Sequence, residues 1–147
     1  MNDDRNSLAI ALFSEVLAAD QMVRARLSKV LPKGMEISHF SVLNHLAGAQ
    51  VERTPAQLAE TFHVTRGAMT NTLSKLEWAG YVHIRPDWDD ARRKMIAISP
   101  AGRQARDHAV GALTPLINQV VEKLGDTKVR EALPILREMR RQLGSEV

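Results

Sequence analysis

The stretch from Thr54 to Gly102 constrains the fold of this chain more than any other. It opens with Thr54-Pro55-Ala56-Gln57, in which the Thr54 hydroxyl and the Gln57 amide are three residues apart, the spacing of a reciprocal capping box. Pro55 stands at the first helical position, where its missing N–H leaves no hydrogen bond unmade. After a turn too short for any other structure, Thr65 is placed to cap a second helix. The pattern therefore predicts two helices joined by a tight turn.

Two short segments with the alternation typical of strands follow these helices. They are Tyr81-Val82-His83-Ile84-Arg85 and Met95-Ile96-Ala97-Ile98-Ser99, and a polar tip that is first acidic and then basic separates them. This arrangement predicts a β-hairpin. Two helices, a tight turn and a hairpin in this order describe a winged helix-turn-helix, in which one helix enters a DNA groove and the hairpin contacts the flanking duplex.

The remaining segments predict further helices, so the expected fold class is mostly α with a small β-hairpin wing (α+β). We expect helices over residues 7–31, 38–47, 55–61, 65–79, 100–124 and 127–143. Ser38 is the expected cap of the second helix and Gly48 its end. Pro115 and Pro134 lie inside the last two helices and should kink or break them. With 147 residues, 44% of them hydrophobic, the chain fits one domain over 1–147, with a winged region over 38–102.

Charge is concentrated in the winged region. Between Arg66 and Arg106 there are eight Lys or Arg and four Asp or Glu, a net charge of +4. Because the whole chain carries +3, the rest of it sums to −1. A local basic face of this kind attracts a polyanion, and we therefore expect double-stranded DNA as the partner.

The predicted helix over 65–79 has two different faces. We expect Ala68, Met69, Leu73 and Leu76 to point inward. The opposite face carries short polar side chains with a cation near each end, the mixture that a recognition helix needs for base edges and phosphates. The residues expected to contact DNA are Thr65, Arg66, Gly67, Thr70, Asn71, Ser74 and Lys75. An ordinary solvated helix face has the same composition, so the helix alone leaves both interpretations open.

The hairpin tip favours the DNA interpretation. Arg92, Arg93 and Lys94 repel one another there, and a hairpin gains no stability from such a cluster. Beside a duplex, an arginine can enter the minor groove while its neighbours meet phosphates. Asp90 is close enough in sequence to pair with Arg92 and fix its direction. The alternative is a solvated charged turn, which is the expectation for Asp87 and Asp89.

The sequence also predicts where the two tryptophans lie. Trp88 lies near the exposed tip, where it either packs on the hairpin or touches DNA, and packing is favoured. Trp78 lies late on the same helix as the recognition residues and is expected in the core.

Three motifs in order resemble the MarR family of bacterial transcription regulators. They are Leu76-Glu77-Trp78-Ala79-Gly80-Tyr81-Val82, Asp90-Ala91-Arg92-Arg93-Lys94 and Ile98-Ser99-Pro100-Ala101-Gly102. The family's wing has an Asp-x-Arg pattern, followed by a hydrophobic strand and a Thr/Ser-x-x-Gly helix start. The resemblance extends over nearly the whole chain, although the terminal helices are less specific than the central motifs.

The resemblance implies a homodimer on a palindromic operator, held together by the helices over 7–31 and 100–144. It implies that Arg92 reads the minor groove with Asp90 as its positioning partner. It also implies a repressor that is released by a small aromatic or phenolic effector, in a pocket near Phe13, His39 and Phe40. The branch of the family that senses oxidants through cysteine is excluded, because the chain has no cysteine.

The dimer has separate support in the apolar stripes of the terminal helices. A compact central module can bury only part of these stripes, so a second subunit is the economical explanation, with an intramolecular bundle as the alternative. The residues are Leu8, Leu12, Val16, Leu113, Leu116, Ile117, Val120, Leu124, Leu133, Leu136 and Leu143.

Other classes of function receive less support. The five histidines lack metal-ligand spacing, so we expect no metal and no cofactor, although a metal-responsive regulator stays an alternative. There is no phosphate-binding loop or nucleophile elbow, and we expect no enzyme. A winged helix that binds only proteins is the second alternative. No apolar run approaches the length of a membrane span, and the start of the chain lacks the features of a secretory signal, so a cytoplasmic protein is expected.

Overall fold

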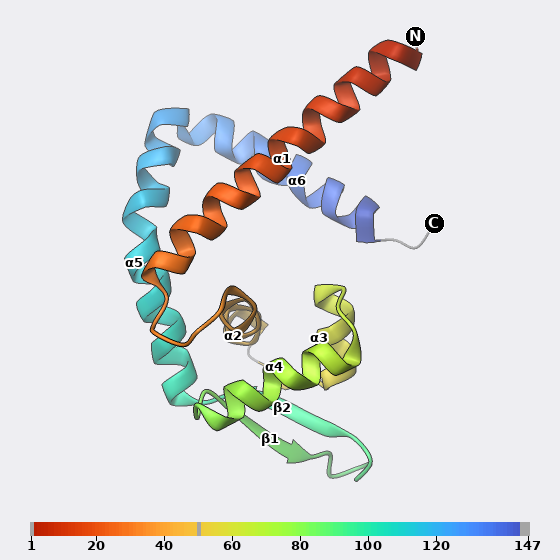
Figure 1. Ribbon diagram of the computed structural model, residues 1–147, viewed down its shortest axis with the longest axis vertical. Helices are drawn as coiled ribbons and strands as arrows, with labels where there is room; N and C mark the ends of the chain where they lie inside the picture. Colours follow the sequence, from red (N-terminus) through yellow and green to blue (C-terminus); the bar gives the residue numbers. More distant parts are fainter. Residues whose placement is uncertain (1, 50, 145–147) are drawn as a thin grey trace. The chain divides into compact units, whose positions relative to one another are not determined.

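The computed structural model describes residues 2–49 and 51–144 and is mostly helical with one two-stranded sheet (Figure 1). The elements are α1 (Asn2–Val30), α2 (Ile37–Ala49), α3 (Pro55–Phe62), α4 (Arg66–Trp78), β1 (Val82–Pro86), β2 (Lys94–Ile98), α5 (Pro100–Leu124) and α6 (Asp126–Gly144). This confirms the predicted fold class and the order of its elements. In the described part of the chain, no helix is both long enough and apolar enough to cross a membrane.

The chain divides into two compact units, one ending at Val110 and the other beginning at Gly111. The first unit contains α1 to α4, the hairpin and the first part of α5. The second contains the rest of α5 and all of α6. We call α2 to β2, residues 37–98, the winged module, and the β1–β2 hairpin, residues 82–98, the wing.

The starts of α3 and α4 follow the predicted capping. The Thr54 hydroxyl accepts a hydrogen bond from the Gln57 N–H at 3.1 Å, and the Thr54 N–H donates to the Gln57 side chain at 2.9 Å. The Thr65 hydroxyl accepts from the Ala68 N–H at 3.1 Å. Between the two helices, His63 adopts a left-handed conformation with φ 53°, which makes the turn tight. The helix-turn-helix is thus fixed by local hydrogen bonds that the sequence specifies.

One hydrophobic core joins the helices of the winged module to the wing. It contains apolar side chains from every element of the module, all almost completely buried, and Figure 1 shows α4 lying alongside the hairpin. Its members are Val42, Leu43, Leu46, Leu58, Ala59, Met69, Leu73, Leu76, Val82 and Ile96. Because α4 contributes three of them, its outer face has a fixed orientation relative to the wing.

The base of the wing is held from both sides. The two strands are antiparallel, with Val82 opposite Ile98 and Pro86 opposite Lys94. Arg53, just before α3, forms an isolated bridge with Ile96 through hydrogen bonds of 3.0 and 2.7 Å. The wing is therefore tied to the start of the helix-turn-helix as well as to its own partner strand.

Ser99 caps α5 as predicted and also ties this helix to the wing. Its hydroxyl accepts from the Gly102 N–H at 3.0 Å and donates to the Gly80 carbonyl at 2.5 Å. A Cβ at Gly102 would lie 2.0 Å from the Tyr81 carbonyl oxygen, so this close approach requires glycine. The Ser-x-x-Gly motif of the sequence thus has a packing reason.

Several predicted boundaries were wrong. α1 begins at Asn2 rather than Ser7. Ser38 and Gly48 lie inside α2 instead of ending it. The side chain that closes the start of α2 belongs to His39, whose Nδ1 accepts from the Glu36 N–H at 3.1 Å. This is half of a capping box, with histidine in the place of the usual Glu or Gln.

The two internal prolines do not break their helices. α5 continues through Pro115 and α6 through Pro134. A proline inside a helix removes one backbone hydrogen bond. The other hydrogen bonds of α5 and α6 keep both helices continuous.

Candidate nucleic-acid interface

The outer face of α4 carries the polar residues that the sequence singled out. Met69, Leu73 and Leu76 are buried beneath it. The exposed residues include all seven expected DNA contacts, namely Thr65, Arg66, Gly67, Thr70, Asn71, Ser74 and Lys75. Ala68 is exposed as well, contrary to the prediction. At about 100° per residue it lies roughly 80° outside the arc of the buried side chains, so it cannot share their face.

Gly67 has no packing reason within the described chain. A Cβ placed there would meet no atom within 4 Å. Glycine inside a helix destabilises the helix by about 1 kcal/mol relative to alanine. At Gly67, no contact within the described chain offsets this loss of stability. A close approach of another molecule to this face stays the prediction for Gly67.

The predicted pair at the tip of the wing is present. One carboxylate oxygen of Asp90 accepts from the Arg92 backbone N–H at 3.1 Å and from its side-chain Nε at 3.2 Å. These hydrogen bonds from Arg92, the side-chain one first, lower the pKa of Asp90 below its ordinary value. The Arg92 side chain nevertheless stays 91% exposed. Asp90 thus orients an arginine that projects from the wing.

Asp87 is part of the turn, contrary to the expectation of a simply solvated carboxylate. Its side chain is 18% exposed and accepts from the Asp89 N–H at 3.0 Å. The Asp87 N–H donates to the Arg93 carbonyl at 3.0 Å, and the two side chains approach to 3.7 Å. The acidic half of the tip therefore shapes the turn, and it leaves the basic half on the outside.

Arg85 has a structural role that the sequence did not reveal. Its guanidinium meets the Glu52 carboxylate through two nitrogens, at 2.7 and 3.2 Å, and lies 5.2 Å from the centre of the Trp88 ring. Glu52 is 33 residues away in sequence, so no local pattern signals this pair. The Arg85 guanidinium is thus bound by other residues of the chain, although it belongs to the basic segment.

A groove of about 900 Å³ lies between α4, the start of α3 and the wing. It brings together Arg66, Thr70 and Ser74 from α4 with Arg92, Arg93 and Lys94 from the wing. Gln57, at the capping box, also lines it and was not predicted as a site residue. Thr65, Gly67, Asn71, Lys75 and Asp90 do not line the groove. The groove-lining residues of α4 and of the wing, 18 residues or more apart in sequence, thus form one surface.

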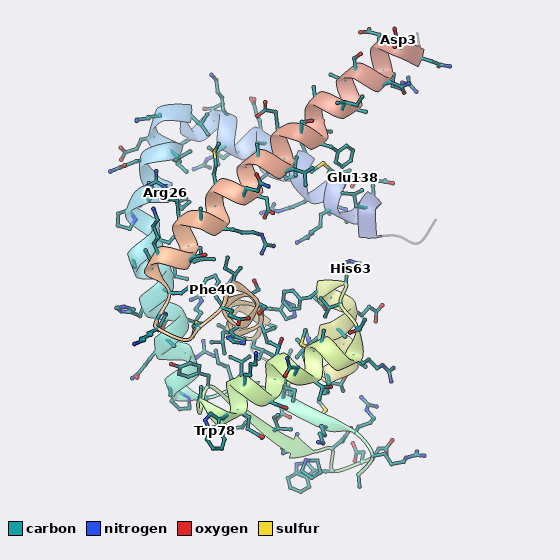
Figure 2. All side chains as sticks on the ribbon, in the orientation of Figure 1. Asp3, Arg26, Phe40, His63, Trp78 and Glu138 are labelled. Carbon is teal, nitrogen blue, oxygen red and sulfur yellow. The ribbon has the colours of Figure 1, made fainter. Side chains whose placement is uncertain are left out.

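Both tryptophans are exposed. Trp78 is 94% exposed and projects from the end of α4, so its prediction as a core residue was wrong (Figure 2). At about 100° per residue it lies roughly 140° from Leu73, on the outer side of the helix. Trp88 is 80% exposed, and its contact with Arg85 is a packing contact that leaves most of the ring open.

A second pocket, of about 470 Å³, lies beside the other end of α4. His39 lines it together with Lys33, Lys75 and Trp78, but neither Phe13 nor Phe40 does. Burial lowers the pKa of His39, with Glu36 acting in the opposite direction and Lys75 adding a smaller decrease. Phe40 is buried in the fold, whereas Phe13 is exposed on α1. Among the described residues there is no group of three or more His, Asp or Glu side chains that could hold a metal ion.

Residues 33–93 match the sequence model of the MarR family. Over its helix-turn-helix and the first part of its wing, the chain is thus similar to the MarR family. No curated protein matches it. The fold is that of solved transcriptional regulators, and together with the family match it supports a DNA-binding regulator.

Solved structures agree with the family over almost the whole chain. The transcriptional regulator BldR from Sulfolobus solfataricus is 26% identical with a TM-score of 0.75, and the match covers 95% of this chain and 96% of that one. A mutant MarR from E. coli in complex with operator DNA is 22% identical with a TM-score of 0.76, covering 89% and 94%. A MarR-family regulator from Rhodococcus sp. RHA1 is 22% identical with a TM-score of 0.75, covering 93% and 94%.

Proposed function

We propose that this MarR-family protein is a cytoplasmic homodimeric repressor that binds a palindromic operator and is released by a small-molecule effector. The observation that carries the DNA-binding surface is the groove in which α4 and the wing meet. In this proposal α4 makes most of its major-groove contacts through Arg66, Thr70, Asn71 and Lys75, with Gly67 allowing close approach. Thr65 and Ser74 are further DNA contacts of the same helix.

The wing makes the second contact in this proposal. Arg92 enters the minor groove, while Arg93 and Lys94 meet phosphates on either side. Asp90 positions Arg92 through the two hydrogen bonds at 3.1 and 3.2 Å. The similarity to an E. coli MarR mutant in complex with operator DNA supports the same mode of binding here.

Exposed apolar side chains support the homodimer. On α1, Leu8, Leu12 and Leu17 are exposed, and Leu27 is the only buried residue of that helix in its described part. On α6, no described residue is buried. Long helices with large exposed apolar side chains are typical of protein interfaces. A second copy of the chain is the partner that the family resemblance implies, and its two-fold symmetry would match a palindromic operator.

Sedimentation equilibrium tests this dimer. We expect a mass twice the 16.4 kDa of one chain at micromolar concentration. A single species of 16.4 kDa under these conditions would show that the exposed helices serve another purpose.

The pocket beside His39 is the candidate effector site in this proposal. The pocket beside His39 is lined by an imidazole, two lysines and the rings of Trp78 and Tyr81. Such a lining favours a small aromatic or phenolic compound with negative charge. Because Ser74 and Lys75 of α4 belong to this pocket, an occupant would act directly on the proposed recognition helix.

A DNA titration at two salt concentrations tests the central claim. Fluorescence anisotropy with duplexes from the region upstream of the protein's own gene, beside a random duplex of equal length, should give tight and sequence-preferring binding. Affinity should fall steeply as salt rises, in proportion to the phosphates contacted. Binding that ignores both sequence and salt would instead favour a winged helix that recognises proteins.

A further inference from the structure

Trp88 is an unusual side chain for the turn of a wing. It is 80% exposed, and in the part of the chain that the structure describes it is the only large apolar side chain exposed in the wing. The neighbouring Asp87 and Asp90 are engaged with Arg93 and Arg92, so the indole is not needed to shape the turn. One exposed apolar side chain is common on protein surfaces, so the position of this indole has to decide whether it has a partner.

The indole is held in place from one side. The Arg85 guanidinium lies 5.2 Å from its ring centre, and the same guanidinium is fixed by two contacts to Glu52. Glu52 precedes Arg53, whose backbone bridges to Ile96 in the wing. A chain of contacts thus runs from the base of the wing to Trp88. It orders one face of the ring and leaves most of the indole exposed.

The position of Arg85 relates the indole to the charged surface. Arg85 lines the groove between α4 and the wing, together with Arg92, Arg93 and Lys94. Trp88 does not line the groove itself, but its ring lies against Arg85, which does. A protein partner would be expected to bury the ring among other apolar side chains, but the residues next to it, Asp87 and Asp89, are acidic. The Asp87 carboxylate is tied into the turn by the Asp89 N–H and by Arg93, while the Arg85 guanidinium lies against the ring. The sugar-phosphate backbone fits better, since an indole N–H only donates and a phosphate oxygen only accepts.

We propose that Trp88 is a further DNA-contacting residue of the wing, which packs its ring on a deoxyribose and donates its N–H to a neighbouring phosphate. This inference rests on the proposed binding of DNA by the wing. The contact extends the surface beyond Arg92 and, because it touches only the backbone, it adds affinity without reading sequence.

Fluorescence separates the two tryptophans of the chain. In Trp78→Phe, Trp88 is the only indole, and saturating operator duplex should shift its emission and reduce its quenching by acrylamide several-fold. Anisotropy of labelled DNA in the same sample reports binding independently. If the DNA is bound and both the emission and the acrylamide quenching of Trp88 are unchanged, the contact does not exist.

Affinity measurements with two variants test the nature of the contact. Trp88→Ala should weaken binding by about 3- to 10-fold, less than the loss of a groove-reading arginine, and equally for operator and random duplex. Trp88→Phe should fall between the parent and Trp88→Ala, because it keeps the ring and removes the donor. Thermal unfolding should be unchanged in both, since the side chain is exposed. A loss confined to the operator, or no loss in Trp88→Ala, would overturn the inference.

The parent protein distinguishes the two levels of failure. A parent that binds no duplex at low salt overturns the proposed function together with this inference. A parent that binds its operator while Trp88→Ala binds equally well overturns the inference alone.

Discussion

Helices α4 and α6 use apolar side chains in opposite ways. In α4, Met69, Leu73 and Leu76 are at most 3% exposed, and they belong to the core of the winged module. In α6, Leu133 and Leu136 are 41% and 48% exposed, and no described residue of the helix is buried. Both patterns have helical spacing. The comparison shows that apolar periodicity reveals the need for a partner, but not whether that partner belongs to the same chain.

The two helices also expose different side chains. The outer face of α4 is polar and, with the wing, lines a groove that contains four arginines and a lysine. The exposed side chains of α6 include leucines and an isoleucine. A polar, basic face suits a phosphate backbone, whereas an apolar one suits another protein surface. The predictions below test this division, beginning with the largest effect.

Shortening a core side chain of α4 should destabilise the winged module strongly. Leu73 is 2% exposed, so Leu73→Ala should lower the free energy of unfolding by about 2–5 kcal/mol, through lost burial and the cavity left behind. Chemical denaturation followed by circular dichroism measures the change. A loss below about 1 kcal/mol, typical of surface positions, would mean that α4 is not anchored as described.

Polar substitution on the apolar face of α6 should change assembly. Leu133→Gln combined with Leu136→Gln removes two exposed leucines three residues apart, and we expect the sedimentation mass to shift from dimer towards monomer. The control is Glu131→Gln combined with Glu138→Gln, which changes two exposed side chains on the opposite side of the same helix. If both double variants keep the dimer mass, α6 does not supply the interface.

Removing the projecting arginine of the wing should weaken DNA binding without changing stability. Arg92→Ala should reduce operator affinity by about 1–3 kcal/mol, the magnitude expected for groove-reading arginines. Unfolding should stay at the parent value, since the side chain is 91% exposed. A variant that binds operator as tightly as the parent would show that the wing assignment is wrong.

The smallest expected effect is a dependence of stability on pH through His39. Burial lowers the pKa of this histidine in the folded protein from its ordinary 6.5. As pH falls below 6.5 the unfolded chain therefore takes up a proton first, and stability decreases until the pH has passed the folded pKa. Protonation would also remove the acceptor for the Glu36 N–H.

The variant His39→Gln keeps an acceptor at this position but does not titrate. Its free energy of unfolding should fall less than that of the parent between about pH 7 and pH 5, as measured by urea denaturation. The other four histidines are common to both proteins and cancel in the difference. A difference that is constant with pH would contradict the role given to His39.

Local signals predicted the helix-turn-helix well. Thr54, Gln57 and Thr65 satisfy backbone groups within three residues of themselves, so their geometry depends on little else. The Asp90–Arg92 pair was predicted for the same reason. Trp78 was not, because its hydrophobicity favours the core while its position around α4 places it outside. The cap of α2 was missed because histidine is an uncommon partner for that hydrogen bond.

The sequence by itself determined the order of the elements, the caps of α3, α4 and α5 and the resemblance to the MarR family. These depend on interactions between residues that are close in sequence, or on motifs read in order. Only the tertiary structure decided that Arg85 is engaged by Glu52, that Trp88 lies against Arg85, and that α4 and the wing line one groove. Such contacts join residues far apart in the chain, and the packing of a shared core, which no local pattern encodes, sets the distances between them.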